Sequence, residues 1–209
     1  MKIKEFMYFY PEKPKLMHVK QDLFGLLSGD PNWVAEKKYN GSRLQLHLID
    51  GKFQFWNRHE KKFGYIPTDD LDLELALFGS RLWKSRPTSV PLDYCLFDGE
   101  LRHHKTIGVR NKIIIYDIFI YDGQLLVGVP FFKRREILET VLEINYEPLG
   151  LIEQFHIGFD KLFDTVIEDP EIEGLVLKNL KGKLNLGRNG PVDSRWMFKV
   201  RKPSGRYKF

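Results

Sequence analysis

Lysines, arginines and carboxylates recur at the ends of apolar runs, and these side chains carry the chemistry available to the chain. Lys38 follows an apolar run, Trp33–Ala35, and precedes the turn residue Gly41. This spacing would place its amine at the rim of a pocket, where neighbouring cations lower the pKa of an amine. A lysine is a covalent nucleophile only when deprotonated. Lys38 is therefore a candidate nucleophile, although a surface lysine at a turn is the commoner meaning of such a short pattern.

Four further motifs follow, each with charged or aromatic side chains beside an apolar run. They are Asp98–Leu101 (DGEL), Tyr116–Phe119 (YDIF), Glu173–Lys178 (EGLVLK) and Trp196–Arg201 (WMFKVR). Successive side chains of a strand point to opposite faces, so Lys199 and Arg201 share one face. Cations grouped with carboxylates suit chemistry on a phosphate ester with a divalent metal.

Other kinds of site are not indicated. The sequence contains no GxxxxGK[ST] loop, no GxGxxG fingerprint and no GxSxG elbow. The single cysteine, Cys95, lies in an apolar run, which favours a buried and inert thiol and excludes an intramolecular disulfide. His103 and His104 are adjacent, so on a strand they would face opposite ways, and a solvated loop pair is favoured over a metal site.

The residues around the motifs predict the elements that position them. Helical periodicity predicts amphipathic helices over 20–28, 69–84 and 131–145, the second with capping and acidic side chains at Thr68–Asp70. Strand patterns occur at 43–49, 52–56, 94–101, 112–120, 173–179 and 196–200, with turns at Asp50-Gly51 and Asp122-Gly123. Hairpins dominate, so we expect an α+β domain with antiparallel β-sheets and flanking helices.

Length and composition favour one folded domain. The chain has 209 residues, of which 43% are hydrophobic and 29 are aromatic (16 Phe, 9 Tyr and 4 Trp). This is enough apolar surface for a sizeable core. The lone cysteine, and the absence of a signal peptide or a bilayer-length apolar run, predict an intracellular protein without a membrane partner. The cytoplasm is expected, with the nucleus or a viral factory left open.

Positive charge is concentrated at the C-terminal end. Residues 178–209 contain ten Lys or Arg and one acid, a net of +9, whereas the whole chain has +5, so residues 1–177 sum to −4. Such a basic segment attracts nucleic acid through its phosphates, although a solvated tail has the same composition. Aromatic residues among the cations (Trp196, Phe198, Tyr207 and Phe209) indicate packing or base stacking.

In this order, the five motifs resemble those of the covalent nucleotidyltransferase superfamily of ATP-dependent DNA ligases, RNA ligases and mRNA capping enzymes. The resemblance covers residues 33–201. KYNG resembles the nucleophile motif KxDG, with Lys38 as the residue that becomes adenylated. FQFWNRHEK resembles the segment that carries a second arginine, here Arg58. The resemblance implies a ligase-type, ATP-grasp-like nucleotidyltransferase domain over residues 1–209.

The resemblance also implies roles for the candidate residues. Tyr116 would stack on adenine, and Glu36 would accept a hydrogen bond from its exocyclic amine. Glu100 and Arg43 would contact the ribose, while Arg58 would bind the 5′-phosphate of the acceptor strand. Lys178, Lys199 and Arg201 would surround the phosphates, and Glu173, with Glu100 nearby, would bind Mg²⁺ or Mn²⁺. The implied nucleotide-binding set comprises Glu36, Lys37, Lys38, Asn40, Arg43, Arg58, Glu100, Tyr116, Glu173, Lys178, Lys199 and Arg201.

Three departures from the family pattern affect these expectations. Asn40 replaces the usual acid of KxDG, and Arg201 replaces a lysine, whose compact ammonium binds phosphate differently from a guanidinium. Only eight residues follow Arg201, whereas relatives usually continue into an OB-fold domain, so we expect a nucleotidyltransferase domain alone. The chain also has no room for the extra domains of NAD-dependent ligases, which favours ATP.

The leading hypothesis is an ATP-dependent polynucleotide ligase that seals nicks between a 5′-phosphate and a 3′-hydroxyl through a lysyl-AMP intermediate. DNA is favoured over RNA as substrate. The alternatives are an RNA ligase, a GTP-dependent capping guanylyltransferase, and a slow module that binds nucleic-acid ends. The expected partners are ATP and nicked or broken-ended nucleic acid, and the expected state is a monomer.

Overall fold

The protein folds into two main β-sheets with helices on their outer faces. The computed structural model describes residues 2–18, 22–64, 69–85, 92–102, 112–166, 168–187 and 189–203. The elements in chain order are β1 (Tyr10–Pro11), β2 (Lys13–Met17), α1 (Asp22–Ser28), β3 (Trp33–Tyr39), β4 (Ser42–Ile49), β5 (Lys52–Asn57), α2 (Asp69–Lys84), β6 (Cys95–Arg102), β7 (Lys112–Tyr121), β8 (Gln124–Leu125), α3 (Phe131–Glu139), β9 (Leu149–Leu151), α4 (Phe159–Val166), β10 (Ile172–Asn179), β11 (Leu186–Gly187) and β12 (Asp193–Arg201).

The larger sheet has the strand order β5-β4-β6-β7-β8, with β9 added beside β7. Its hairpins follow from local sequence. Asp50 and Gly51 both have positive φ, at 49° and 72°, and join β4 to β5, while Asp122 and Gly123, at 50° and 73°, join β7 to β8. Alternate residues of β4, namely Leu44, Leu46 and Leu48, enter a core that α2 covers.

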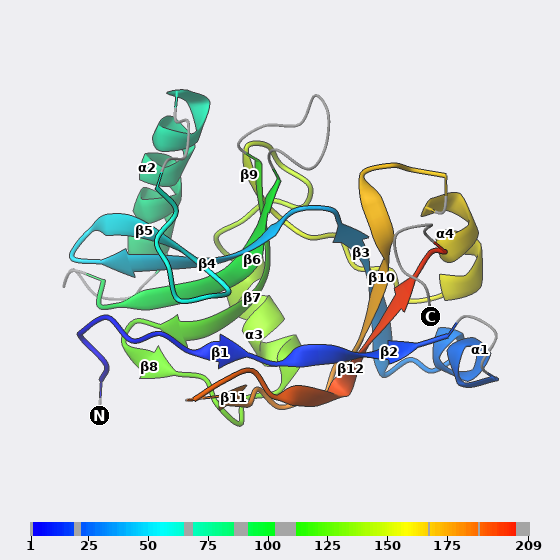
Figure 1. The fold of residues 1–209 in the computed structure, drawn as a ribbon. Coiled ribbons are helices and arrows are strands. Elements are labelled where there is room, and N and C mark those ends of the chain that lie inside the picture. Colours follow the sequence, from blue (N-terminus) through cyan, green and yellow to red (C-terminus); the bar gives the residue numbers. More distant parts are fainter. Residues whose placement is uncertain are drawn as a thin grey trace.

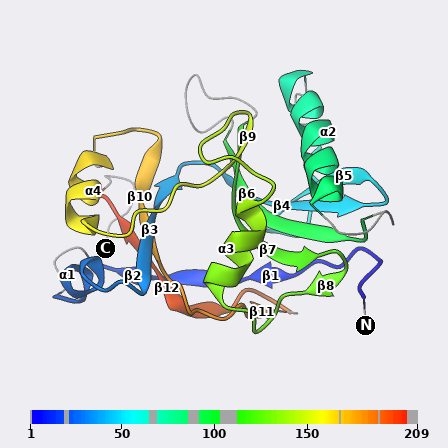
Figure 2. The ribbon, with the colours of Figure 1, turned by 180° about the vertical axis from the view of Figure 1, so that it is seen from behind.

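The smaller sheet has the order β2-β12-β10-β3. One of its faces packs with α1 and α4 in a second core, which contains Phe24, Phe163 and Leu175. Figures 1 and 2 show α1 and α4 at one end of the molecule and α2 at the other. The facing surfaces of the two sheets are thereby left for polar side chains.

The predicted α+β class with antiparallel sheets is confirmed, with two additions. β12 pairs with β2, and β7 with β9, in parallel. The sequence patterns also missed α4 and the short strands β1, β2, β8, β9 and β11. None of the helices in the described ranges is long and apolar enough to cross a membrane.

The third predicted helix is shorter than expected. α3 ends at Glu139, and Thr140 caps it, its Oγ1 donating to the carbonyl of Ile137 over 2.7 Å. Val141 and Leu142 continue the apolar spacing that predicted a helix to residue 145, but they are buried in the turn that follows. The apolar spacing at these positions therefore reflects burial, and it does not mark the length of the helix.

Cys95 is buried, as predicted. Three other interpretations concern residues outside the described ranges: the helix cap at Thr68, the pair His103–His104, and the aromatics Tyr207 and Phe209.

Candidate active site

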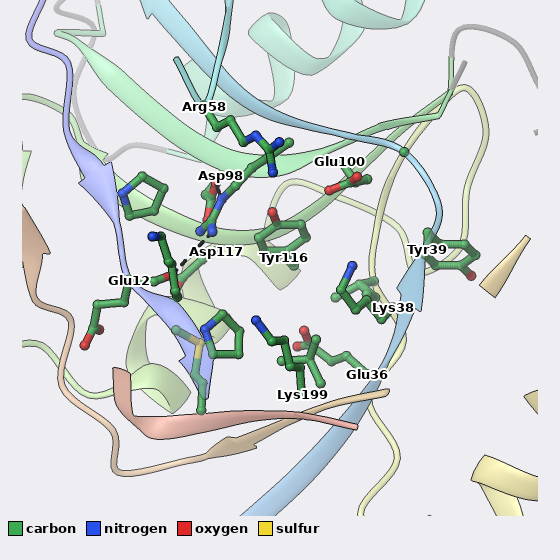
Figure 3. Close-up of a pocket in the computed structure, with 18 of the residues that line it drawn as sticks. Glu12, Glu36, Lys38, Tyr39, Arg58, Asp98, Glu100, Tyr116, Asp117 and Lys199 are labelled. Atoms are coloured by element: carbon green, nitrogen blue, oxygen red, sulfur yellow. Dashed lines mark hydrogen bonds and ion pairs between the residues drawn. The ribbon is translucent and has the colours of Figure 1, made fainter. Parts of the chain in front are cut away.

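A cavity of about 900 Å³ lies between the facing surfaces of the two sheets. Of the predicted nucleotide-binding set, all members except Asn40 line it. Figure 3 shows Tyr116 in the middle of this group, with Arg58 on one side and Lys199 on the opposite side. Motifs that are far apart in the sequence therefore meet at one site.

Lys38 lies on β3 and contacts a carboxylate of the neighbouring strand. Its Nζ donates to Oε2 of Glu173 over 2.6 Å, and the two side chains are 23% and 27% exposed. Arg201 Nη2 lies 3.5 Å from the same Oε2. The amine is therefore within reach of a ligand in the cavity and is paired with a carboxylate.

A β-bulge places Glu173 beside Lys38. In the pairing of β10 with β3, Ile172 opposes Tyr39 and Gly174 opposes Lys38, so Glu173 is the extra residue. Gly174 has φ of 145°, and a Cβ there would lie 2.0 Å from the carbonyl oxygen of Val200. The glycine of EGLVLK is therefore required by backbone geometry and by the close approach of β12.

Gly41, in the connection from β3 to β4, is required for a different reason. A Cβ at this position would lie 2.6 Å from Cγ of Glu100 and 2.7 Å from the carbonyl oxygen of Leu101. The glycine lets the chain that follows Lys38 pass directly against Glu100. Its neighbour Asn40 donates its backbone N–H to the carbonyl of Glu171 over 2.8 Å.

Lys199 and Arg201 face the cavity from β12, as strand alternation predicts. Burial lowers the pKa of Lys199, and the nearby charges of Arg201, Lys38 and Lys13 lower it further. A cluster of like charges is unfavourable unless an anion compensates it. The cluster is therefore suited to a phosphate group, and Lys13, which the motifs did not indicate, is part of it.

Lys178 is paired with Glu36 deep in the site. Its Nζ lies 2.6 Å from Glu36 Oε2, and the side chains are 4% and 2% exposed. The same ammonium donates to the carbonyl of Tyr116 over 3.1 Å and lies 5.1 Å from the centre of the Tyr116 ring. Lys178 was expected among the phosphate-binding cations, but its contacts with Glu36 and Tyr116 place it with the two residues expected to bind the base.

Tyr116 lies on β7, and cations from two other strands border its ring. Arg43 lies 5.7 Å from the ring centre, in addition to Lys178. Burial raises the pKa of the Tyr116 hydroxyl well above 10, so the phenol is neutral. A neutral aromatic ring at a cavity wall offers an apolar face to a base.

Two acidic residues that were not singled out in the sequence anchor this region. Asp98, the first residue of DGEL, accepts hydrogen bonds from Nε and Nη2 of Arg43, the first over 2.9 Å. Asp117, the residue after Tyr116, accepts from Nε and Nη2 of buried Arg134 on α3 over 2.7 and 2.8 Å. Asp98 belongs to the motif DGEL and Asp117 to the motif YDIF, so membership of these motifs could have identified both acids as site residues.

The remaining predicted residues lie around the cavity. Arg58 is exposed, and its Nε donates to Nε2 of His59 over 3.1 Å. Glu100 lines the cavity on β6. Lys37 also lines the cavity, and its Nζ lies 5.6 Å from the centre of the Phe155 ring. Lys202, which follows the last motif, is half-buried and donates to the carbonyl of Asp169 over 2.5 Å.

The residues that the structure describes contain no group of three or more His, Cys, Asp or Glu side chains that could hold a metal ion.

Two sheets with a cavity between them, lined by lysines, arginines and carboxylates, make up the fold of a nucleotidyltransferase domain of the ligase type. The model of one family, the ATP dependent DNA ligase domain, matches residues 100–200, and this stretch belongs to that family.

Curated relatives and solved structures agree. DNA ligase 3 of Dictyostelium discoideum is 30% identical over 196 residues, covering 85% of this chain and 16% of that protein. The DNA ligase of vaccinia virus (strain Ankara) is 26% identical over 178 residues, covering 78% of this chain and 31% of that protein. The structure of a mycobacterial DNA ligase D complexed with ATP and MES superimposes with a TM-score of 0.58 at 17% identity, covering 91% of this chain and 60% of that chain. The chain thus spans less than a third of the length of these curated relatives.

Proposed function

We propose that the chain is the nucleotidyltransferase domain of an ATP-dependent polynucleotide ligase, and that it seals nicks in DNA. The observation that carries this proposal is the placement of Lys38, with its amine at a cavity wall and beside Glu173 and Arg201. The names of the relatives, which are DNA ligases, support DNA over RNA as the substrate.

In the proposed reaction, the Lys38 nitrogen forms a bond to the α-phosphorus of ATP as the bond to pyrophosphate breaks. Lys199 and Arg201 stabilise the negative charge that develops on the phosphate. AMP then passes from Lys38 to the 5′-phosphate of a nick, which Arg58 holds, and the 3′-hydroxyl displaces AMP to close the strand. Tyr116 stacks on the adenine, Glu36 accepts from its amine, and Arg43 and Glu100 hold the ribose.

The carboxylates in the cavity fit Mg²⁺ or Mn²⁺ in the usual manner of nucleotide enzymes. Mg²⁺ commonly takes one or two protein carboxylates together with substrate phosphates, so a cage of three acidic side chains is not required. Glu173 is the ligand we assign, with Glu100 second. When bound, the metal supplies positive charge to the phosphates.

We further propose that the chain acts as an intracellular monomer.

Covalent labelling tests the proposal. The protein is incubated with α-³²P-ATP or α-³²P-GTP and a divalent metal, then run on a denaturing gel. We expect label from ATP, none with Lys38→Ala, and normal label with Lys133→Ala, because Lys133 is an exposed lysine on α3 that pairs with Glu136 and does not line the cavity. Label from GTP would favour a capping guanylyltransferase, no label would favour a module that binds nucleic-acid ends, and label that survives in K38A would refute the assigned nucleophile.

A second assay separates DNA from RNA ligation. Nicked duplexes with DNA or RNA on each side of the break are offered to the adenylated protein. Sealing only of RNA-containing nicks would replace DNA ligase with RNA ligase.

A further inference from the structure

Gln154 contacts Glu36, the buried carboxylate that is proposed to accept a hydrogen bond from the adenine amine. Its Nε2 donates to Glu36 Oε1 over 2.9 Å, while Lys178 binds the other oxygen, Oε2. One donor on each oxygen fixes the plane of the carboxylate. Each oxygen still has a lone pair for a further hydrogen bond.

The backbone around Gln154 is held independently of the cavity. Ala35 N–H donates to the carbonyl of Phe155 over 2.8 Å, and Phe155 N–H donates to the carbonyl of Ala35 over 2.9 Å. The residues next to Glu36 and Gln154 are thus paired to each other. Arg135 Nη1 also donates to the carbonyl of Ile152 over 2.7 Å, which ties the segment to α3. The backbone that carries Gln154 is therefore held beside the strand that carries Glu36.

The Glu36–Lys178 pair presents two opposite hydrogen-bonding characters to a purine. A carboxylate accepts from the amine of adenine, whereas an ammonium donates to the carbonyl oxygen of guanine. Which base is preferred depends on which of these two groups is held toward the ligand.

We propose that Gln154 is a positioning residue for purine selection. By holding Oε1 of Glu36, it keeps the carboxylate oriented to accept from the adenine amine, so that ATP is chosen over GTP. This inference rests on the proposed function, because it assigns base selection to the same site.

The test compares Gln154→Met, which keeps length and removes the donor, with Glu153→Met. Glu153 is the neighbouring residue, and it accepts an exposed hydrogen bond from Asn145 Nδ2 over 3.1 Å. Adduct formation at Lys38 is measured with ATP, with GTP and with purine riboside triphosphate, which lacks the exocyclic amine. For Q154M we expect a KM for ATP raised roughly ten-fold, an ATP-over-GTP preference lowered by about the same factor, and little change for the amine-free analogue. E153M should match the wild type.

An equal loss with all three nucleotides, or an unchanged ATP-over-GTP ratio, would show that Gln154 is only structural. Gln154→Lys restores a donor facing Glu36 and should recover the preference for ATP, and its failure to do so in a folded protein would also overturn the proposal. If Q154M does not fold, Q154K and Gln154→Leu give the same comparison. Absence of any adduct in the wild type would instead refute the proposed function.

Discussion

The protonated form of Lys199 is disfavoured by its surroundings. Burial lowers the pKa of its ammonium, and Arg201, Lys38 and Lys13 lower it further, so it loses its proton at a lower pH than an exposed lysine does. A phosphate-binding cation that deprotonates becomes ineffective. If Lys199 binds phosphate as proposed, the upper pH limit of adenylation depends on this residue.

Lys199→Arg should shift that limit. Arginine stays protonated at any pH at which the protein is folded, so the decline of the lysyl-AMP rate at alkaline pH should move to higher pH in K199R. The rate at neutral pH should fall less than ten-fold, because a cation remains. The measurement is a pH profile of the single-turnover rate with saturating ATP. A decline at the same pH in both proteins would contradict the assignment.

His47, outside the cavity, affects stability. It lies on β4 with no exposed surface, its Nδ1 is 2.6 Å from the hydroxyl of Tyr94, and burial lowers its pKa to about 3. The unfolded chain binds a proton below pH 6.5, whereas the folded protein does so only near pH 3. This histidine therefore costs stability as pH falls through that window, by about 2 kcal/mol between pH 7 and pH 5.

His47→Phe removes this proton uptake. The loss of unfolding free energy between pH 7 and pH 5, measured by urea denaturation, should be about 2 kcal/mol smaller than in the wild type. His156→Gln, at an exposed histidine, serves as the control and should retain the wild-type dependence. A dependence that is identical in H47F and wild type would exclude His47 as its source.

At the level of elements, the bulge in β10 connects strand pairing to the site. Gly174→Ala would force a side chain to within 2.0 Å of the Val200 carbonyl at a φ of 145°. We expect a loss of roughly 2 to 4 kcal/mol in unfolding free energy. Gly25→Ala on α1, where a Cβ meets no atom within 4 Å, should be neutral or slightly stabilising. Thermal and urea unfolding measure both, and a G174A protein as stable as G25A would show that the bulge can relax.

The sequence predicted elements where the deciding interactions are local. α2 and the β4–β5 hairpin follow from periodicity and from the Asp50-Gly51 turn. β2 was missed because its partner is β12, more than 170 residues later, where Phe198 opposes Lys15. α4 had a usable signal in Phe159, Phe163 and Val166, whose spacing is helical.

In the candidate site too, residues placed by local sequence were predictable and residues placed by tertiary packing were not. Motif order and strand alternation predicted which residues line the cavity, including Lys38, Glu173 and Tyr116. Partners that lie behind those residues were not predictable. Gln154 and Arg134 belong to no motif, and only the packing of their segments against β3 and β7 brings them to Glu36 and Asp117.

At the scale of the whole molecule, the two sheets have separate apolar interiors. The core under α2 and the core between α1 and α4 share no member, and a small cluster that includes Phe131 and Trp196 lies apart from both. Polar contacts join the sheets near the cavity. Arg102 on β6 pairs with Glu171 and lies 4.5 Å from the centre of the Tyr39 ring.

Separate interiors make each half of the molecule a potential unit of hydrogen exchange, with its own free energy of opening. A nucleotide bound in the cavity would touch both halves, since Tyr116 belongs to one sheet and Lys199 to the other. Opening either half would then release the nucleotide, and mass action would add the same free energy to the protection of both. A bound nucleotide would thus couple the opening of the two halves, so that amides far apart in the chain become protected from exchange together.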